Sequence, residues 1–203
     1  MKLRISFLAA LTATLLAAPA AHADDAKYMA GFYLAIKAIQ VTALSGTADM
    51  WKALGHAQKA QETLGIAKDL EKGDLGPEVA QNAMKVASAE VQAQIEELEA
   101  VGAPLTKEQR AAAASAYLKI AGTTVLWVGA LAAAKKSLES DEIDGTTKLM
   151  LGLAMAGEVA EAGSATNQLL QAWRSYSQFN SGLRGLKAPS KELMKEAPLL
   201  AAL

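Results

Sequence analysis

The sequence predicts an all-α protein, an up-and-down bundle of about five long helices with a short C-terminal helical extension. Apolar residues recur three or four positions apart over long stretches, which is the spacing of one face of an α-helix. Glycines, prolines and capping residues separate these stretches at short intervals, as expected for helices joined by tight turns. Runs with the two-residue period of a β-strand are not found in the sequence.

The first 23 residues have the pattern of a cleaved signal peptide. Lys2 and Arg4 precede the apolar stretch Ile5–Ala18, which is shorter than a membrane-spanning helix needs. The segment Ala21-His22-Ala23 matches the small-residue cleavage pattern, so the mature chain is expected to begin at Asp24. We therefore expect an exported, soluble periplasmic protein, and an uncleaved N-terminal anchor is the alternative.

The first two helices of the bundle are predicted over residues 24–45 and 47–72. Gly46 is expected to end the first helix, because glycine commonly follows the last helical residue. Thr47 is then the expected N-cap of the second helix, and Gly73 is expected to end it.

The third helix is expected to begin at Pro77, since proline is favoured in the first helical turn, and to end at Gly102. Thr106 and Gln109 match the capping-box pattern, in which each residue satisfies a free backbone N–H group of the other. A fourth helix is therefore predicted from this pair to about Ser140.

The fifth helix is predicted over residues 145–180, with Ser181 and Gly182 ending it. The chain is thus expected to form a single bundle domain with segments at both ends. Its predicted parts are residues 1–23 as the signal peptide, 24–181 as the helical bundle domain, and 182–203 as a C-terminal tail with a short helix.

The fourth predicted helix is nearly free of charge. Lys119 is the only charged residue between Arg110 and Lys135, so this helix is apolar around its whole circumference. Such a helix is typical of the centre of a bundle. Its length also permits membrane insertion, but alanine and glycine drive insertion weakly, so we expect a central helix.

The fifth predicted helix has Glu158 and Glu161 as its only charges over residues 149–170. Small residues lie three or four positions apart on it, at Gly152, Ala156, Ala160 and Gly163. They predict either close packing against another helix or an apolar cavity where side-chain volume is missing. Met150 and Met155 would form an adaptable lining for such a cavity.

Few enzyme chemistries fit this composition. The sequence has no cysteine, and His56, expected on an ordinary amphipathic helix, is the only histidine beyond residue 23. Di-iron carboxylate, structural zinc and covalent haem sites therefore lack their ligands. The sequence also has no Gly-x-Ser-x-Gly elbow and no complete phosphate loop, so we expect no catalytic residue, metal or cofactor.

The charge balance bears on the class of partner. The chain has 20 Lys and Arg against 21 Asp and Glu, evenly interleaved and without a basic patch. Nucleic acid is therefore not expected as a partner, because its binding depends on clustered positive charge.

One interpretation of these charges places a polar group inside the apolar contact of the fourth and fifth helices. Pairing of Lys119 with Glu158 and Glu161 would offset the free energy that burial of these charges costs. Such a trio would orient the hydroxyl or headgroup of an amphiphile. The alternative is that both glutamates face solvent.

The whole mature chain resembles the small all-helical periplasmic component of bacterial sterol and lipid trafficking systems. The resemblance depends on the signal ending Ala21-His22-Ala23, the two apolar helices and the lack of an enzyme motif. It implies a non-enzymatic protein that carries a lipid or sterol-like ligand in a cavity between helices, for transport between membranes, with a membrane or other transport components as partners. The ligand-binding residues it implies are Tyr117, Lys119, Glu158 and Glu161 as polar anchors, with Trp127, Met150 and Met155 in the lining.

A second class of function remains open from the residues. The small-residue faces would also suit a periplasmic helical scaffold or protein–protein interaction module that has no small-molecule ligand. An exposed apolar patch on the folded protein would favour this second class, and an enclosed cavity would favour ligand carriage.

Overall fold

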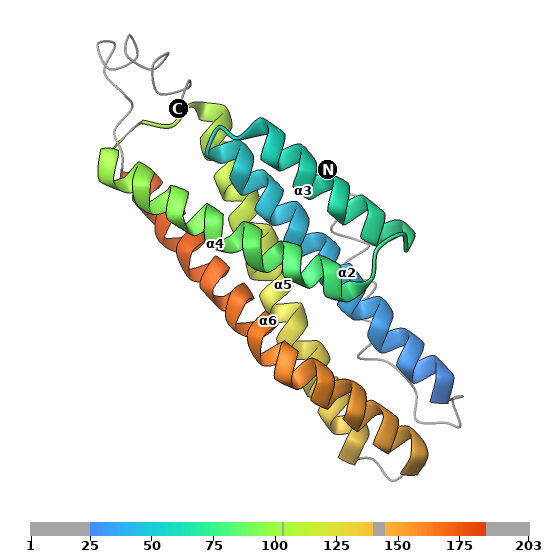
Figure 1. Cartoon of the computed structure of the whole chain (residues 1–203). Coiled ribbons are helices and arrows are strands. Elements are labelled where there is room, and N and C mark those ends of the chain that lie inside the picture. The colour runs from blue at the N-terminus through green and yellow to red at the C-terminus, as the bar shows by residue number, and fades with distance from the viewer. Residues whose placement is uncertain (1–24, 103, 140–144, 186–203) are drawn as a thin grey trace.

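The structure, a computed structural model, describes residues 25–102, 104–139 and 145–185, and all of its elements there are helices. In chain order these are α2 (Asp25–Ala53), α3 (Ala57–Lys72), α4 (Pro77–Val101), α5 (Lys107–Glu139) and α6 (Gly145–Gly185). Successive helices run in opposite directions along one long axis (Figure 1), which confirms the predicted all-α bundle. The predicted signal peptide and the predicted tail helix lie outside the described residues.

The boundary predicted between the first two helices is wrong. Helix α2 continues through Gly46 to Ala53, because this glycine is needed for a close helix contact and not for a helix end. A Cβ atom at Gly46 would lie 3.1 Å from Cβ of Lys119 and 3.2 Å from Cγ1 of Ile120, both on α5. Thr47, the expected cap, donates its hydroxyl to a carbonyl one turn earlier in the same helix, at 3.1 Å.

The first helix ends instead at Ala53, and a short turn leads into α3. Gly55 has a φ of 86°, in the left-handed region that favours glycine. His56, which we expected inside an amphipathic helix, is the residue immediately before α3. Its Nε2 lies 3.0 Å from Oε1 of Gln94 on α4, and its ring meets the ring of Trp51 edge to face. The histidine therefore joins three helices at this turn.

The other predicted helix signals of α3, α4 and α5 are confirmed. Gly73 and Gly102 follow α3 and α4 with φ values of 90° and 66°, and Pro77 is the first residue of α4. At the start of α5 the backbone N–H of Thr106 donates to Oε1 of Gln109 at 2.8 Å. The backbone N–H of Gln109 donates to the hydroxyl of Thr106 at 3.2 Å, which completes the capping box.

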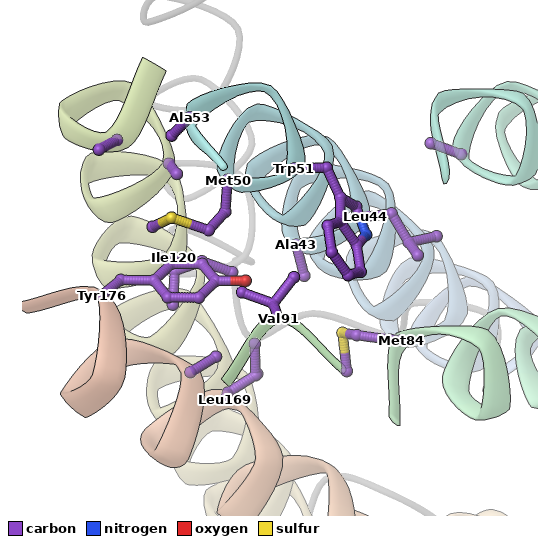
Figure 2. Close-up of a cluster of buried hydrophobic side chains, with 14 of the residues drawn as sticks. Ala43, Leu44, Met50, Trp51, Ala53, Met84, Val91, Ile120, Leu169 and Tyr176 are labelled. Atoms are coloured by element: carbon purple, nitrogen blue, oxygen red, sulfur yellow. The ribbon is translucent and has the colours of Figure 1, made fainter. Parts of the chain in front are cut away.

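The central helix is α2, and not α5 as the sequence predicted. Helix α2 contacts all four other helices, whereas α5 contacts mainly α2 and α6. The core cluster includes Trp51 and Met50 of α2, Val91 of α4 and Tyr176 of α6 (Figure 2). The prediction failed because alanine is apolar but is also tolerated in water, so an alanine-rich helix need not be central.

Helix α6 is longer than predicted. It passes the expected stop at Ser181 and Gly182 and ends at Gly185. Leu183 is buried in this last turn and belongs to the core. The additional turn therefore buries a large apolar side chain, and this burial extends the helix past two residues that ordinarily favour a helix end.

Candidate functional site

Helix α5 carries two apolar stripes with the same spacing of three and four residues, on opposite sides of the helix. The inner stripe is buried against the bundle and consists of Ala113, Ala116, Ile120, Thr123, Trp127, Ala130 and Ala134. The outer stripe, as we call it, consists of Ala111, Ala114, Leu118, Ala121, Val125, Val128 and Ala132. Alternating spacings of three and four are typical of helix surfaces that pack against another helix.

The outer stripe faces solvent in the described part of the chain. The exposed fractions of its larger side chains are 68% for Leu118, 73% for Val125 and 54% for Val128. Next to the stripe, Cβ atoms added at Gly122 and Gly129 would meet nothing within 4 Å. The stripe is therefore an accessible apolar surface with room for close approach of another helix.

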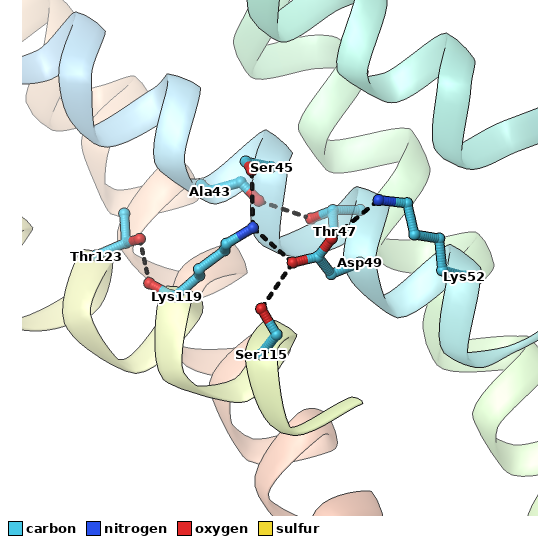
Figure 3. Close-up of polar contacts among 8 residues, drawn as sticks. All are labelled: Ala43, Ser45, Thr47, Asp49, Lys52, Ser115, Lys119 and Thr123. Carbon is cyan, nitrogen blue, oxygen red and sulfur yellow. Dashed lines mark hydrogen bonds and ion pairs between the residues drawn. The ribbon is translucent and has the colours of Figure 1, made fainter. Parts of the chain in front are cut away.

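Lys119 does not interrupt the outer stripe, because its side chain turns toward α2 (Figure 3). Its Nζ lies 2.5 Å from Oδ2 of Asp49 and 3.0 Å from Oγ of Ser45. The hydroxyl of Ser115 donates to the same carboxylate oxygen at 2.8 Å, and Nζ of Lys52 lies 3.3 Å from the other. The only charge of residues 111–134 is thus paired away from the stripe.

The pKa of Asp49 is lowered from its ordinary value of 3.8. Burial, the largest single influence, raises this pKa. Hydrogen bonds from Lys119 and Ser115 and the positive charges of Lys119 and Lys52 lower the pKa, and their combined effect exceeds that of burial. Asp49 is therefore ionised at neutral pH and acts as a fixed counter-ion for Lys119.

Replacing Asp49 with asparagine is expected to lower the free energy of unfolding by about 2 kcal/mol at pH 7, because a partly buried Lys119 loses its counter-ion. The pKa of Asp49 is lower in the folded protein than in the unfolded chain. The stabilisation by ionised Asp49 is therefore fully present above its ordinary pKa of 3.8 and is lost as pH falls through the lower, folded value. Urea unfolding at pH 7 and pH 3 measures this effect. The difference between wild type and variant should shrink at pH 3, and an undiminished difference would contradict the assignment.

Trp127, expected in the lining of a ligand cavity, is a core residue with 3% of its surface exposed. Its indole N–H donates to the hydroxyl of Thr166 on α6. Together with Ile39, Met84 and Leu169 it borders a cavity of about 10 Å³. That volume corresponds to roughly one water molecule, whereas sites for small organic ligands occupy about 300–1,000 Å³.

The structure does not bring Lys119 together with Glu158 and Glu161. The hydrogen bond between Trp127 and Thr166 fixes how the antiparallel helices α5 and α6 align. At about 1.5 Å per residue from that contact, the backbone positions of both glutamates lie roughly 20 Å or more from Lys119 along the bundle axis. Asp49 takes the place of the expected glutamate partners.

The structure describes only one of the remaining predicted ligand-binding side chains. Tyr117 is half-buried and packs against the core. The side chains of Met150, Met155, Glu158 and Glu161 lie outside what the structure describes, so their role in ligand binding stays a prediction.

A groove of about 440 Å³ lies between α4 and α6, and no sequence signal indicated it. Its lining combines apolar surface, which makes up the larger share, with amides and hydroxyls such as those of Ser88, Gln92, Asn167 and Gln171. Tyr176 lies beside it with a fully buried side chain, and burial raises the pKa of this phenol, which stays protonated. The groove was missed because its residues belong to the polar sides of two helices whose pairing the sequence does not specify.

Comparisons with known proteins provide no relative: no protein-family model matches the chain, and no curated protein or solved structure shows significant similarity. Among the residues described, no three His, Cys, Asp or Glu side chains gather as a candidate metal site. The outer stripe is therefore interpreted from its own geometry. Sequence reasoning missed it because the inner and outer stripes together make α5 look uniformly apolar.

Proposed function

We propose that this protein is a non-enzymatic interaction module that binds an apolar partner helix through the outer stripe of α5. The observation that carries the proposal is a charge-free, heptad-spaced stripe that faces solvent while the core lies on the other side of the helix. Full burial of a Val or Leu side chain contributes roughly 1.5–3 kcal/mol, so covering Leu118, Val125 and Val128 would favour association. The proposal takes residues 1–23 as a signal peptide and the periplasm as the compartment.

Lipid binding is a second proposal, in which the protein carries a lipid or sterol-like ligand between membranes, as the sequence resemblance implies. It is supported by the length and composition of α5, which are sufficient for a membrane span, and by the small share, 28%, of its most apolar stretch that is buried. The 10 Å³ cavity beside Trp127 is too small for such a ligand, so this proposal requires a binding site elsewhere on the protein.

A photo-reactive amino acid placed at position 125 distinguishes the two proposals. In cells, we expect light to join the protein to another polypeptide at this position, because the side chain points out from the centre of the stripe. The matched control is position 68 on α3, where Lys68 is also exposed but lies in a charged surface. Mass spectrometry of the products identifies what was joined.

The added substitution Val128→Glu should abolish the cross-link at position 125. It places a charge on an exposed position, so the free energy of unfolding should change by no more than about 0.5 kcal/mol. A cross-linked lipid at position 125 would replace the first proposal with the second. Equal cross-linking at positions 125 and 68 would overturn both.

A further inference from the structure

We infer that the partner helix is α5 of a second copy of this chain, packed antiparallel so that two outer stripes meet across a two-fold axis. The inference rests on the proposed function of the outer stripe and specifies its partner. A two-fold interface must be complementary to itself, so residue pairs in one half are repeated in the other. The sequence of α5 meets this condition in one particular alignment.

Steps of three and four residues alternate along the outer stripe. In that alignment, each stripe residue reached by a step of four faces a stripe residue of the second copy reached by a step of three. Leu118 then lies opposite Val128 of the second copy, and Val125 lies opposite Ala121 of the second copy. A large side chain thus meets a smaller one in each of these layers, as interdigitated packing requires. Gly122 lies beside its own counterpart near the two-fold axis, where the lack of a side chain permits close approach.

The same alignment pairs opposite charges at both ends of the stripe. Lys107 lies opposite Glu139 of the second copy, and Glu108 lies opposite Lys136 of the second copy. All four residues are exposed in the single chain. Glu139 also lies 4.0 Å from Nζ of Lys135 on the same helix, in an exposed ion pair that leaves it accessible to a second copy. By symmetry each pair occurs twice, so the charges flank the apolar stripe and set its alignment.

Other alignments lose this complementarity. A parallel pair would place Lys107, Lys135 and Glu139 each opposite its own counterpart, so three sets of like charges would meet. An antiparallel pair shifted by one heptad in either direction would separate both opposite-charge pairs. The charges outside the stripe therefore select the antiparallel alignment centred near residue 123.

A helix of a second copy fits this surface better than a lipid does. The outer stripe is dominated by alanine and valine and contains no aromatic residue. Helices that lie on membranes present large apolar and aromatic side chains, with lysine or arginine along the polar side. Small residues at heptad spacing instead permit close contact between two helices.

Single cysteines test the alignment, because the natural chain contains none. With a short thiol-specific bis-maleimide, the full mature chain carrying Gly122→Cys should be joined into a covalent dimer. The matched control is Gly129→Cys, also an open glycine of α5. In the proposed alignment its two copies lie about 20 Å apart along the axis, so no dimer should form. Cross-linking of both variants would show a parallel pair and overturn the inference.

A charge exchange provides an independent readout. Glu108→Lys and Lys136→Glu should each weaken dimerisation about three- to tenfold in sedimentation equilibrium, because exposed ion pairs contribute little individually and each change affects two of them. The double variant should restore the wild-type dissociation constant. A double variant weaker than both single variants would overturn the pairing.

Experiments can distinguish an error in the partner inferred here from an error in the proposed function. If the wild-type chain sediments as a monomer and Gly122→Cys gives no covalent dimer, the second copy is excluded as the partner. A different polypeptide joined at position 125 would then still support helix binding by the outer stripe. Absence of any product at position 125 would overturn both.

Discussion

Replacing Trp127 with alanine is expected to destabilise the bundle by about 3–5 kcal/mol, the range for removal of a large aromatic side chain from a core. The side chain is 3% exposed and borders a small cavity together with Ile39 of α2, Met84 of α4 and Leu169 of α6. The substitution also removes the donor to the hydroxyl of Thr166, which links α5 to α6. Packing and hydrogen bonding are thus lost together.

Urea unfolding of the Trp127→Ala variant measures this loss. The matched control is Trp173→Ala on α6, where 36% of the residue is exposed, and the loss of stability should be clearly smaller. Trp127→Phe should retain part of the stability by filling most of the space. If Trp127→Ala kept its stability but lost binding of an added lipid, the tryptophan would be a ligand-lining residue, as the sequence suggested.

Replacing Gly46 with leucine is expected to lower the free energy of unfolding by about 3 kcal/mol through overpacking. The first added carbon would lie 3.1 Å from Cβ of Lys119, and two carbons of Ile120 would lie at 3.2 and 3.3 Å. These neighbours lie near the backbone of α5, so the helices would have to separate. Separation would also stretch the contact between Lys119 and Asp49.

Gly65 on α3 provides a control for the effect of glycine on helix stability. A Cβ atom there would meet nothing within 4 Å, so Gly65→Ala should stabilise the protein by about 0.5–1 kcal/mol. Gly46→Ala should not stabilise the protein, because crowding of the added methyl group against α5 offsets the better helix propensity of alanine. Equal stabilisation by the two alanine substitutions in thermal or urea unfolding would show that Gly46 is not a packing residue.

The ion pair and the outer stripe are connected through one helix. Because Asp49 draws Lys119 toward α2, the solvent-facing side of α5 stays free of charge over residues 111–134. The close contact at Gly46 brings α2 near enough for this pair to form. The packing of α2 on α5 therefore prepares the surface that we propose for partner binding.

The sequence by itself determined the fold class and most helix ends. Gly73, Gly102 and Pro77, and the capping box of Thr106 and Gln109, act where they were expected. These signals are reliable because they depend on backbone conformation and on hydrogen bonds between residues within a few positions of each other. The lack of charge along α5 was also evident from the sequence, although its cause was misread.

Only the tertiary structure decided which residues meet across helices. Lys119 pairs with Asp49, 70 positions earlier, and Gly46 acts as a contact point and not as a helix end. It also decided that α2 is central, which leaves the outer stripe of α5 in solvent. A helical period shows that a surface is apolar, but the choice of covering partner depends on packing between segments far apart in the chain.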